Sequence, residues 1–322
     1  MSDPGIRSAV FLDLDSIDRD DLDLSKLNAM VDNWQWHGLV KEGELDEVLA
    51  SADVVVSNKV LLTDERLSKA KHLKLVCIAA TGTNNIDLEA AARNNIAVCN
   101  VDGYATPSVV QHVFTLLLAL TTRFNEYTTA VKDGAWSRSR FFCLLDYPIR
   151  ELAGKTIGIV GYGHLGKAVA SIAEAFGMKV LLAKRNIEDE RPGRVALHDL
   201  LPQVDVLSLH CPLTAETRGL IAADELALMK KDAVLINTAR GGLVDEDALL
   251  EALKLQQIGG AGLDVLETEP PPAGYPILKA ELPNLVITPH TAWASRESRQ
   301  RLLDEIALNI EAFKAGELRN AV

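Results

Sequence analysis

The segment from Thr156 to Arg185 constrains the fold more than any other part of the sequence. It opens with an apolar run, Thr156–Val160, whose β-branched residues indicate a strand buried on both faces. Gly161-Tyr162-Gly163-His164-Leu165-Gly166 follows directly, and then come an Ala-rich helical segment up to Phe176 and a second strand that ends at Ala183. A strand, a Gly-rich turn, a helix and a strand within about thirty residues form the βαβ context in which such glycines bind a dinucleotide. We therefore predict a dinucleotide site here, with an ordinary structural turn as the alternative.

The spacing of the three glycines has a chemical reason. Gly161 permits a tight turn, Gly163 lets the backbone approach a pyrophosphate, and Gly166 lets the helix pack closely on its strand. The free amides at the N-terminus of that helix would then face the anion.

The residues after the second strand indicate which dinucleotide binds. An NAD site usually has an acidic residue there, roughly 20 residues past the glycines, which accepts hydrogen bonds from the ribose 2′-hydroxyl. In this chain Lys184 and Arg185 occupy that position, and no acidic residue follows before Glu188. Two cations would attract a 2′-phosphate, and an arginine can bind it in bidentate fashion. We therefore favour NADP(H) over NAD(H) as the cofactor, with a solvated basic turn as the other reading.

Length and composition predict a globular protein of two domains. A chain of 322 residues is long for one domain, and its 48% hydrophobic residues are enough for a large core. The net charge of −12 argues against nucleic acid or an anionic membrane as the main partner. We find no secretory signal and no apolar run of membrane-spanning length. The four cysteines show no metal-binding spacing, and unpaired thiols favour a cytoplasmic location.

Strand and helix signals alternate on both sides of the dinucleotide segment. This pattern predicts an α/β protein with parallel sheets. The glycine fingerprint for a dinucleotide, residues 161–166, lies in the middle of the chain. The simplest layout is therefore a cofactor domain inserted into a discontinuous domain. Strands are expected at 8–14, 54–57, 73–79, 96–99, 204–209, 233–236, 258–263 and 285–288, a long helical stretch at 105–131, and an amphipathic helix at 295–313.

Three strand ends in the second half carry polar residues of complementary kinds. Arg240 follows one strand, Glu269 follows the next, and His290 follows the last. The carboxyl ends of parallel strands point toward the cofactor crevice, so these side chains could converge there. Taken singly, each has an ordinary reading: a surface cation in a turn, a solvated carboxylate and a satisfied loop histidine.

The three residues suit the reduction of a carbonyl by a nicotinamide. Hydride delivery leaves an alkoxide that needs a proton, which histidine can supply near neutral pH. A carboxylate beside an imidazole fixes its tautomer and favours its charged form. An arginine near the cofactor can bind a substrate carboxylate and polarise the carbonyl.

Taken together, these motifs resemble the D-isomer-specific 2-hydroxyacid dehydrogenases. The resemblance covers essentially the whole chain and rests on an ordered set of segments. These segments are 161–166, His210-Cys211-Pro212-Leu213-Thr214, Asn237-Thr238-Ala239-Arg240-Gly241, Glu269 and Pro289-His290-Thr291-Ala292. Further segments are most similar to bacterial glycerate dehydrogenases, also called hydroxypyruvate reductases: Ser57-Asn58-Lys59-Val60, residues 79–87, residues 100–106 and residues 290–295.

The resemblance implies a domain organisation and an oligomeric state. It implies two Rossmann-like, doubly wound domains: a flavodoxin-like substrate-binding domain of residues 1–102 and 293–322, and an NAD(P)-binding domain of residues 103–292. It also implies a homodimer built on the segment 105–150. The aromatic and basic residues from Trp136 to Phe142 fit such an interface arm.

The resemblance also assigns roles to single residues. His290 is the expected general acid/base, Glu269 its partner, and Arg240 the ligand of the substrate carboxylate and carbonyl. Substrate binding is expected from Asn58, Lys59, Thr81, Gly82 and Trp293. Cofactor binding is expected from Thr106, Gly161, Gly163, His164, Leu165, Gly166, Lys184, Arg185, His210, Cys211, Pro212, Thr217, Thr238, Ala239, Asp264 and Ala292. No metal site is expected.

The expected activity is NAD(P)H-dependent reduction of hydroxypyruvate, and of glyoxylate, to D-glycerate and glycolate. One alternative is a dehydrogenase of this family for another small 2-keto acid. The other, from a different class, is a dinucleotide-sensing binding protein similar to the C-terminal-binding co-repressors.

Overall fold

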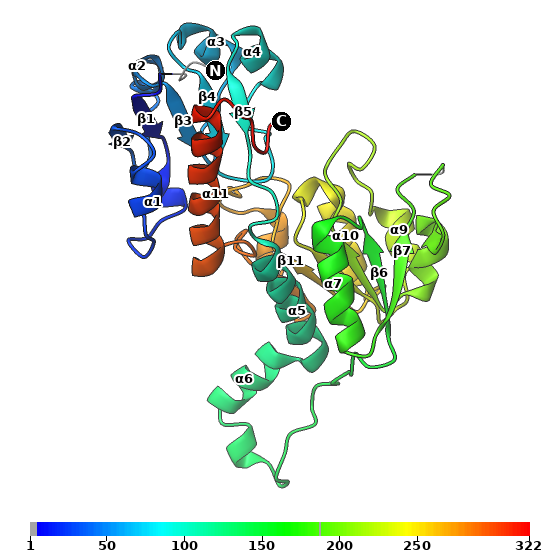
Figure 1. Cartoon of the computed structure of the whole chain (residues 1–322). Helices are drawn as coiled ribbons and strands as arrows, with labels where there is room; N and C mark the ends of the chain where they lie inside the picture. Colours follow the sequence, from blue (N-terminus) through cyan, green and yellow to red (C-terminus); the bar gives the residue numbers. More distant parts are fainter. Residues whose placement is uncertain (1–4, 187) are drawn as a thin grey trace. The chain divides into compact units, whose positions relative to one another are not determined.

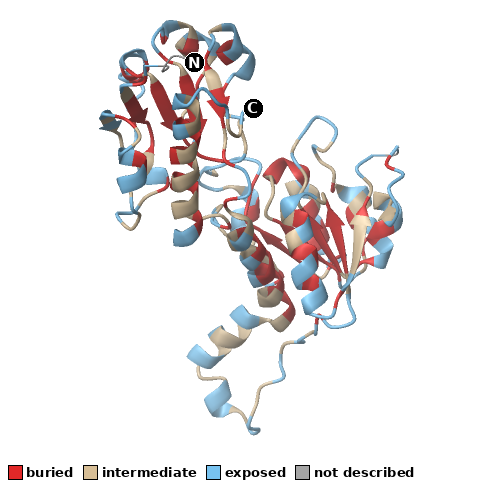
Figure 2. Cartoon of the chain, in the orientation of Figure 1, coloured by how far each residue is buried: buried red, intermediate tan, exposed pale blue. Residues whose placement is uncertain are grey.

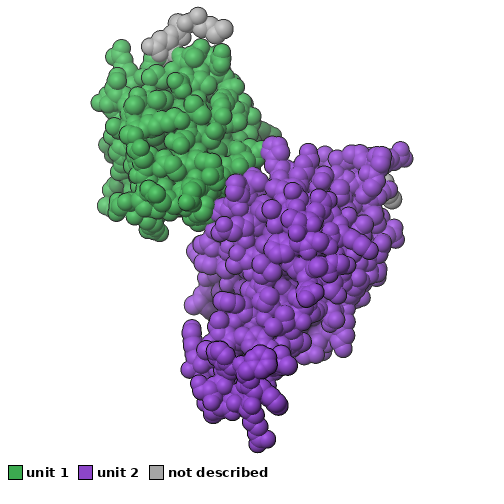
Figure 3. Space-filling view, turned by 60° about the horizontal axis from the view of Figure 1, so that its bottom comes forward, with its two compact units in different colours: residues 1–105, 293–322 green, residues 106–292 purple. Residues whose placement is uncertain are grey.

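The computed structural model describes residues 5–186 and 188–322 (Figure 1). The strands form two separate parallel sheets, and most of the buried residues lie in them and on the helix faces that cover them (Figure 2). The chain divides into two compact units: residues 1–105 with 293–322, called unit 1, and residues 106–292, called unit 2 (Figure 3). The first four residues of the predicted substrate-binding domain lie outside the described residues.

The sheet of unit 1 has the strand order β2-β1-β3-β4-β5, and every described pair is parallel. Its strands β3 and β4 are buried along their whole length, as expected for a parallel sheet covered on both faces. The bounds are β1 (Ser8–Phe11), β2 (Asn33–Trp36), β3 (Val54–Ser57), β4 (Leu75–Ile78) and β5 (Ala97–Cys99).

Helices cover both faces of this sheet. Because alternate strand residues point to opposite faces, Val10 and Val55 pack with helices α2, α3 and α4, whereas Phe11 and Val56 pack with α1 and α11. Helix α11 comes from the far end of the chain, yet Leu302, Ile306 and other residues of it are fully buried in the unit 1 core. The bounds are α1 (Ser25–Asn28), α2 (Leu45–Ser51), α3 (Asp64–Lys69), α4 (Leu88–Arg93) and α11 (Arg296–Lys314).

The sheet of unit 2 has the order β12-β11-β10-β9-β6-β7-β8 and is also parallel throughout the described pairs. The order reverses between β6 and β9, which makes this point the topological switch where such sheets bind their ligands. The bounds are β6 (Thr156–Val160), β7 (Lys179–Ala183), β8 (Arg194–Val195), β9 (Val206–Leu209), β10 (Val234–Asn237), β11 (Gly260–Leu263) and β12 (Leu285–Ile287).

Helices on both faces complete the doubly wound fold. One face packs against α8, α9 and α10 in a single apolar core, and α5 and α7 lie against the other face and against each other. The rings of Phe114 in α5 and Phe176, directly after α7, stack 5.3 Å apart. The bounds are α5 (Thr106–Thr122), α6 (Phe124–Lys132), α7 (His164–Ala175), α8 (Leu197–Leu200), α9 (Ala223–Leu228) and α10 (Glu246–Lys254).

Residues 124–150, called the arm, extend away from the sheet of unit 2 (Figures 1 and 3). No residue of the arm is buried (Figure 2). It is nevertheless held by internal bonds: Trp136 Nε1 donates to the Phe142 carbonyl at 2.9 Å, and the Tyr127 hydroxyl donates to the Tyr147 carbonyl at 2.7 Å.

The structure confirms the predicted fold class, two doubly wound α/β units with parallel sheets, and differs in detail. The helical stretch expected at 105–131 is two helices, because Arg123 adopts a left-handed backbone with φ 56°. The first strand ends at Phe11 and not at residue 14. Strands β2 and β8 were not expected. Among the described residues, no helix is long and apolar enough to cross a membrane.

Candidate active site

The three fingerprint glycines at the switch point have different surroundings. At Gly161, with φ +91°, a Cβ atom would overlap the peptide group between His210 and Cys211. At Gly166 it would overlap the carbonyl oxygen of Gly161, whereas at Gly163 no heavy atom lies within 4 Å. The turn and the helix packing thus require glycine at two positions, and the middle position leaves room for a ligand against the backbone.

Two buried polar atoms at strand ends of this sheet, after β9 and β10, have no hydrogen-bond partner among the described residues. They are His210 Nδ1 and Thr238 Oγ1. His210 Nε2 lies 2.8 Å from Ser208 Oγ, and burial lowers the pKa of His210 to about 4, so the ring is neutral at pH 7. Buried polar groups are rarely left unsatisfied. Together with the space at Gly163, these atoms fit a bound dinucleotide.

Cations gather where strand β7 ends. Lys184 follows the strand, and its amide donates to the Val195 carbonyl at 2.8 Å. Arg194 Nη1 donates to the Ala183 carbonyl at 3.2 Å, and its guanidinium lies 5.0 Å from the ring centroid of Tyr162 in the fingerprint turn. Arg194 is therefore a third cation at this strand end, which the sequence reasoning missed.

A nearby carboxylate, that of Asp189, is already engaged. Arg191 binds it in bidentate fashion at 2.7 and 2.7 Å, and the Arg185 amide donates to it at 2.9 Å. The hydrogen bond from Arg191 holds the pKa of Asp189 well below its usual range. This carboxylate is thus committed to the protein and does not replace the missing ribose-binding acid.

His290 and Glu269 form a hydrogen-bonded pair. His290 Nδ1 lies 2.7 Å from Glu269 Oε2, and each side chain is 33% exposed. The other oxygen, Glu269 Oε1, accepts the amide of Leu266 at 2.9 Å, which fixes the carboxylate. An imidazole oriented in this way through one nitrogen can exchange a proton through the other.

The backbone of His290 is held in a rare conformation. Its φ is 54°, in the left-handed region, and its amide donates to the Asp264 carbonyl at 2.8 Å. The Asp264 carboxylate is 1% exposed and accepts the amides of Thr291 at 2.9 Å and Ala292 at 2.8 Å. Asp264 therefore anchors the backbone of residues 290–292.

The loop that carries Arg240 lies against the loop that carries Glu269. Asn237 shapes it, since its side chain accepts the Ala239 amide at 3.0 Å and donates to the Arg240 carbonyl at 2.8 Å. A Cβ atom at Gly241 would overlap the Leu266 carbonyl, so the two loops are in backbone contact. The Arg240 guanidinium itself donates to the Ala239 carbonyl at 2.7 Å.

The comparisons with known proteins decide the family. The family model "D-isomer specific 2-hydroxyacid dehydrogenase, NAD binding domain" matches residues 114–292. Over 316 residues the chain is 45% identical to a glycerate dehydrogenase of Methylorubrum extorquens, covering 98% of this chain and 99% of that one. The chain belongs to the D-isomer-specific 2-hydroxyacid dehydrogenases. The resemblance seen in the sequence is confirmed, and the protein is an NAD(P)-dependent oxidoreductase.

Two further proteins are similar to this dehydrogenase over most of its length. A hydroxypyruvate reductase of Blautia hydrogenotrophica is 39% identical over 305 residues, covering 89% of this chain and 94% of that one. A solved structure of an acyclic imino acid reductase in complex with NADPH and D-Arg has a TM-score of 0.85 at 32% identity, covering 98% and 99% of the two chains.

The other residues predicted to bind the cofactor lie in unit 2 of the dehydrogenase. Thr106 is the first residue of α5, and His164 and Leu165 are the first two of α7. Thr217 Oγ1 donates to the Pro212 carbonyl at 2.7 Å. Burial raises the pKa of the Cys211 thiol to about 11, so this cysteine is not a reactive thiolate.

The residues predicted to bind substrate lie in unit 1. The amides of Asn58 and Lys59 donate to the buried carboxylate of Asp13, at 2.9 and 2.6 Å. Burial raises the pKa of Asp13. Thr81 Oγ1 donates to the Val101 carbonyl at 2.8 Å, and Gly82 follows it in a loop after β4. The ring of Trp293 packs edge-on against Tyr104 at 6.5 Å.

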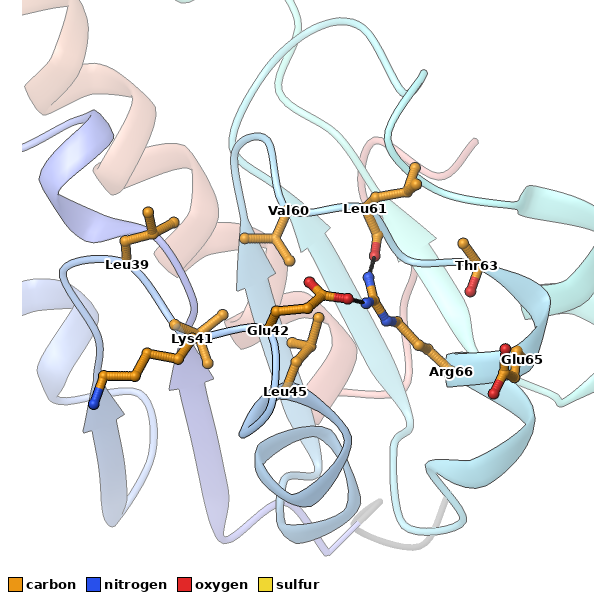
Figure 4. A pocket seen from close by; sticks show the side chains of 10 residues that line it. Leu39, Lys41, Glu42, Leu45, Val60, Leu61, Thr63, Glu65 and Arg66 are labelled. Carbon is orange, nitrogen blue, oxygen red and sulfur yellow. Dashed lines mark hydrogen bonds and ion pairs between the residues drawn. The ribbon is translucent and has the colours of Figure 1, made fainter.

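Unit 1 of the dehydrogenase also has an open hollow of about 800 Å³ (Figure 4). The side chain of Arg66 crosses it, donating to the Leu61 carbonyl at 2.7 Å and pairing with Glu42. Because this guanidinium already has protein partners, and no predicted site residue lines the hollow, we do not assign it to the substrate. Among residues 5–186 and 188–322, no cluster of side chains could hold a metal ion.

Proposed function

We propose that this dehydrogenase reduces hydroxypyruvate to D-glycerate, and glyoxylate to glycolate, with NADPH as the preferred cofactor. The observation that carries the proposal is the His290–Glu269 pair, held on strand ends of the sheet that bears the dinucleotide fingerprint. The names of the similar proteins, a glycerate dehydrogenase and a hydroxypyruvate reductase, support the substrate class.

The roles of the residues follow from their geometry. When bound, NADPH would supply the hydride for the keto carbon, and the alkoxide oxygen of the substrate would need a proton from the protein. We assign that proton to His290 Nε2, because Nδ1 is bonded to Glu269. Arg240 would exchange its bond to Ala239 for the substrate carboxylate, which offers an ionised acceptor in place of a carbonyl.

The remaining assignments are proposals of the same kind. Asn58, Lys59, Thr81, Gly82 and Trp293 would bind the substrate in unit 1, and the 16 residues named above, from Thr106 to Ala292, would bind the cofactor in unit 2. A 2′-phosphate would lie among Lys184, Arg185 and Arg194. We place the enzyme in the cytoplasm, supported by its free cysteines, and as a homodimer through the arm.

Initial rates with hydroxypyruvate, glyoxylate and pyruvate, each with NADPH and NADH, test the function. Hydroxypyruvate with NADPH should be fastest. His290→Ala should lower kcat by roughly 10²–10⁴-fold and leave NADPH binding nearly intact, as for loss of a proton donor. The matched control is His198→Ala, since His198 also pairs with a glutamate, Glu225, at 2.9 Å but lies on the exposed surface of α8.

Two outcomes would contradict the proposal. Full activity in the His290→Ala enzyme would remove this residue from the mechanism. No turnover of any 2-keto acid by the wild-type protein would favour the dinucleotide-sensing binding protein instead.

A further inference from the structure

His112, in the second turn of α5, takes part in the hydrogen bonds between Asp264 and residues 288–292. Its Nε2 lies 2.8 Å from Thr288 Oγ1 and 3.3 Å from Asp264 Oδ1. Thr288 Oγ1 in turn lies 2.6 Å from the same Asp264 oxygen. His112 is 176 residues from Thr288 in the sequence, and neither residue was among the predicted site residues.

The direction of each hydrogen bond in this network can be worked out. The Asp264 carboxylate takes hydrogens from Thr288 and from the amides of Thr291 and Ala292. Although burial opposes it, the bonds from His112, Thr288 and the amides lower the pKa of Asp264, so it is ionised and can only accept. The single hydroxyl hydrogen of Thr288 therefore goes to Asp264. The Thr288 oxygen, at 2.8 Å, and Asp264 Oδ1, at 3.3 Å, are then both acceptors toward His112 Nε2, so Nε2 must carry a hydrogen and donate it to this pair.

This network fixes a segment that is otherwise unfavourable. His290 has a left-handed backbone, which is uncommon for residues other than glycine and is retained here by its surroundings. Asp264 holds this backbone with two groups. Its carbonyl accepts the His290 amide, and its carboxylate accepts the amides of Thr291 and Ala292. Thr288, two residues before His290, bonds to the same carboxylate. The loop is thus held on each side of the histidine by one aspartate.

We propose that His112 is a positioning residue for the reaction, which orients Thr288 and Asp264 so that their bonds keep His290 directed for proton transfer. This inference rests on the proposed role of His290 as general acid/base. His112 does not contact the reacting atoms in this account. It fixes the Thr288 hydroxyl toward Asp264 and supplies the buried carboxylate with a further donor nearby.

The test compares two replacements of His112 that differ in one property. His112→Phe keeps a ring and removes the donor, whereas His112→Gln keeps an N–H near the position of Nε2. We expect His112→Phe to lower kcat for hydroxypyruvate by roughly 10- to 100-fold, since a small misplacement of a catalytic group has effects of this size. The KM for hydroxypyruvate should change by less than about threefold. His112→Gln should recover kcat to within about fivefold of wild type.

A second pair protects the test against a folding defect. Thr288→Val removes the hydroxyl at nearly constant shape and should lower kcat as His112→Phe does, whereas Thr288→Ser should keep most of it. His198→Phe, on the exposed surface of α8, should leave kcat unaltered.

The results separate this inference from the proposed function. Two results would overturn the positioning role while His290→Ala still lowers kcat as proposed. One is equal losses of kcat in the Phe and Gln variants, and the other is kcat within about twofold of wild type in both His112→Phe and Thr288→Val. Full activity in His290→Ala would instead overturn the proposed function.

Discussion

At the scale of single residues, we expect the end of β7 to set the preference between NADPH and NADH. Arg194 is held in place by the Ala183 carbonyl and by the ring of Tyr162, so its guanidinium is already positioned at the end of β7 before the cofactor binds. Asp189, the carboxylate that could compete for a ribose hydroxyl, is bound by Arg191. Both features favour a 2′-phosphate over a 2′-hydroxyl.

Arg194→Ala should therefore weaken NADPH much more than NADH. A hydrogen bond to a charged group is worth about 1.5–3 kcal/mol, so kcat/KM for NADPH should fall by roughly 10- to 100-fold while that for NADH stays nearly constant. Initial rates at varied cofactor concentration measure both values. The matched control is Lys179→Ala, a cation removed from the other end of the same strand. Equal losses with the two cofactors would show that Arg194 does not read the phosphate.

Single residues also show how far the sequence could predict the site. Motifs with fixed spacing contain the three glycines, Arg240, Glu269 and His290. The order of residues alone was therefore enough to predict that they belong to one site. Asp13, His112 and Arg194 stand in no motif. Their roles depend on contacts with residues distant in the chain, such as Asn58 for Asp13 and Thr288 for His112, and only the folded chain shows these.

At the scale of elements, strand β11 is shaped to receive helix α5. A Cβ atom on Gly262 would lie 2.9 Å from both Leu116 Cβ in α5 and Ile236 Cδ1 in β10. The absence of a side chain at Gly262 lets the helix pack directly on the strand. Since α5 also carries His112, this packing sets the distance between the helix and Thr288.

Gly262→Ala should push α5 away from the sheet. Overpacking of this kind costs about 1–3 kcal/mol of stability, and kcat should fall as well because His112 moves with the helix. Chemical denaturation and initial rates measure the two effects. Gly163→Ala should leave the stability unchanged, since no heavy atom lies within 4 Å of the new methyl group. It should instead lower the affinity for the cofactor, because the methyl group fills the space that we assign to the ligand. Equal stability of the two variants would contradict this packing argument.

The elements that the sequence did not predict have weak local signals. Strand β2 lies at the edge of its sheet and has the sequence Asn-Trp-Gln-Trp. Its exposed polar residues alternate with half-buried rings, so it lacks the apolar run of a buried strand. Strand β8 has only two residues. The break at Arg123 has no glycine or proline to mark it. Buried strands such as β3 and β6, in contrast, are continuous apolar runs and could be predicted closely.

At the scale of the whole molecule, the arm carries a group of large apolar side chains that are exposed. Phe142 is 91% exposed, Leu145 83% and Phe141 77%, although hydrogen bonds within the arm keep it ordered. An ordered apolar surface of this kind indicates a protein partner. A second copy of the chain is the partner that we propose.

Replacing Phe142 and Leu145 together by Ser should therefore shift the protein from dimer to monomer. Large apolar side chains at the centre of an interface each contribute about 1–3 kcal/mol, so the dimer dissociation constant should rise by at least roughly 100-fold. Light scattering during gel filtration would then report a mass near the 35.0 kDa of one chain. The control exchanges Leu39 and Leu61, also exposed but in unit 1, for Ser. A monomeric wild type, or a double variant that stays dimeric, would refute the interface.

The return of α11 to unit 1 has a consequence for synthesis on the ribosome. The first hundred residues emerge early, but their core lacks Leu302, Leu303, Ile306 and Ile310 until the last helix has been made. The final residues then close the sheet edge, where the Val322 amide donates to the Val98 carbonyl. Unit 2, an uninterrupted stretch of chain, can be complete while unit 1 still exposes an apolar face. Unit 1 therefore exposes an apolar face until the ribosome has made α11, and we expect a molecular chaperone to bind unit 1 during that interval.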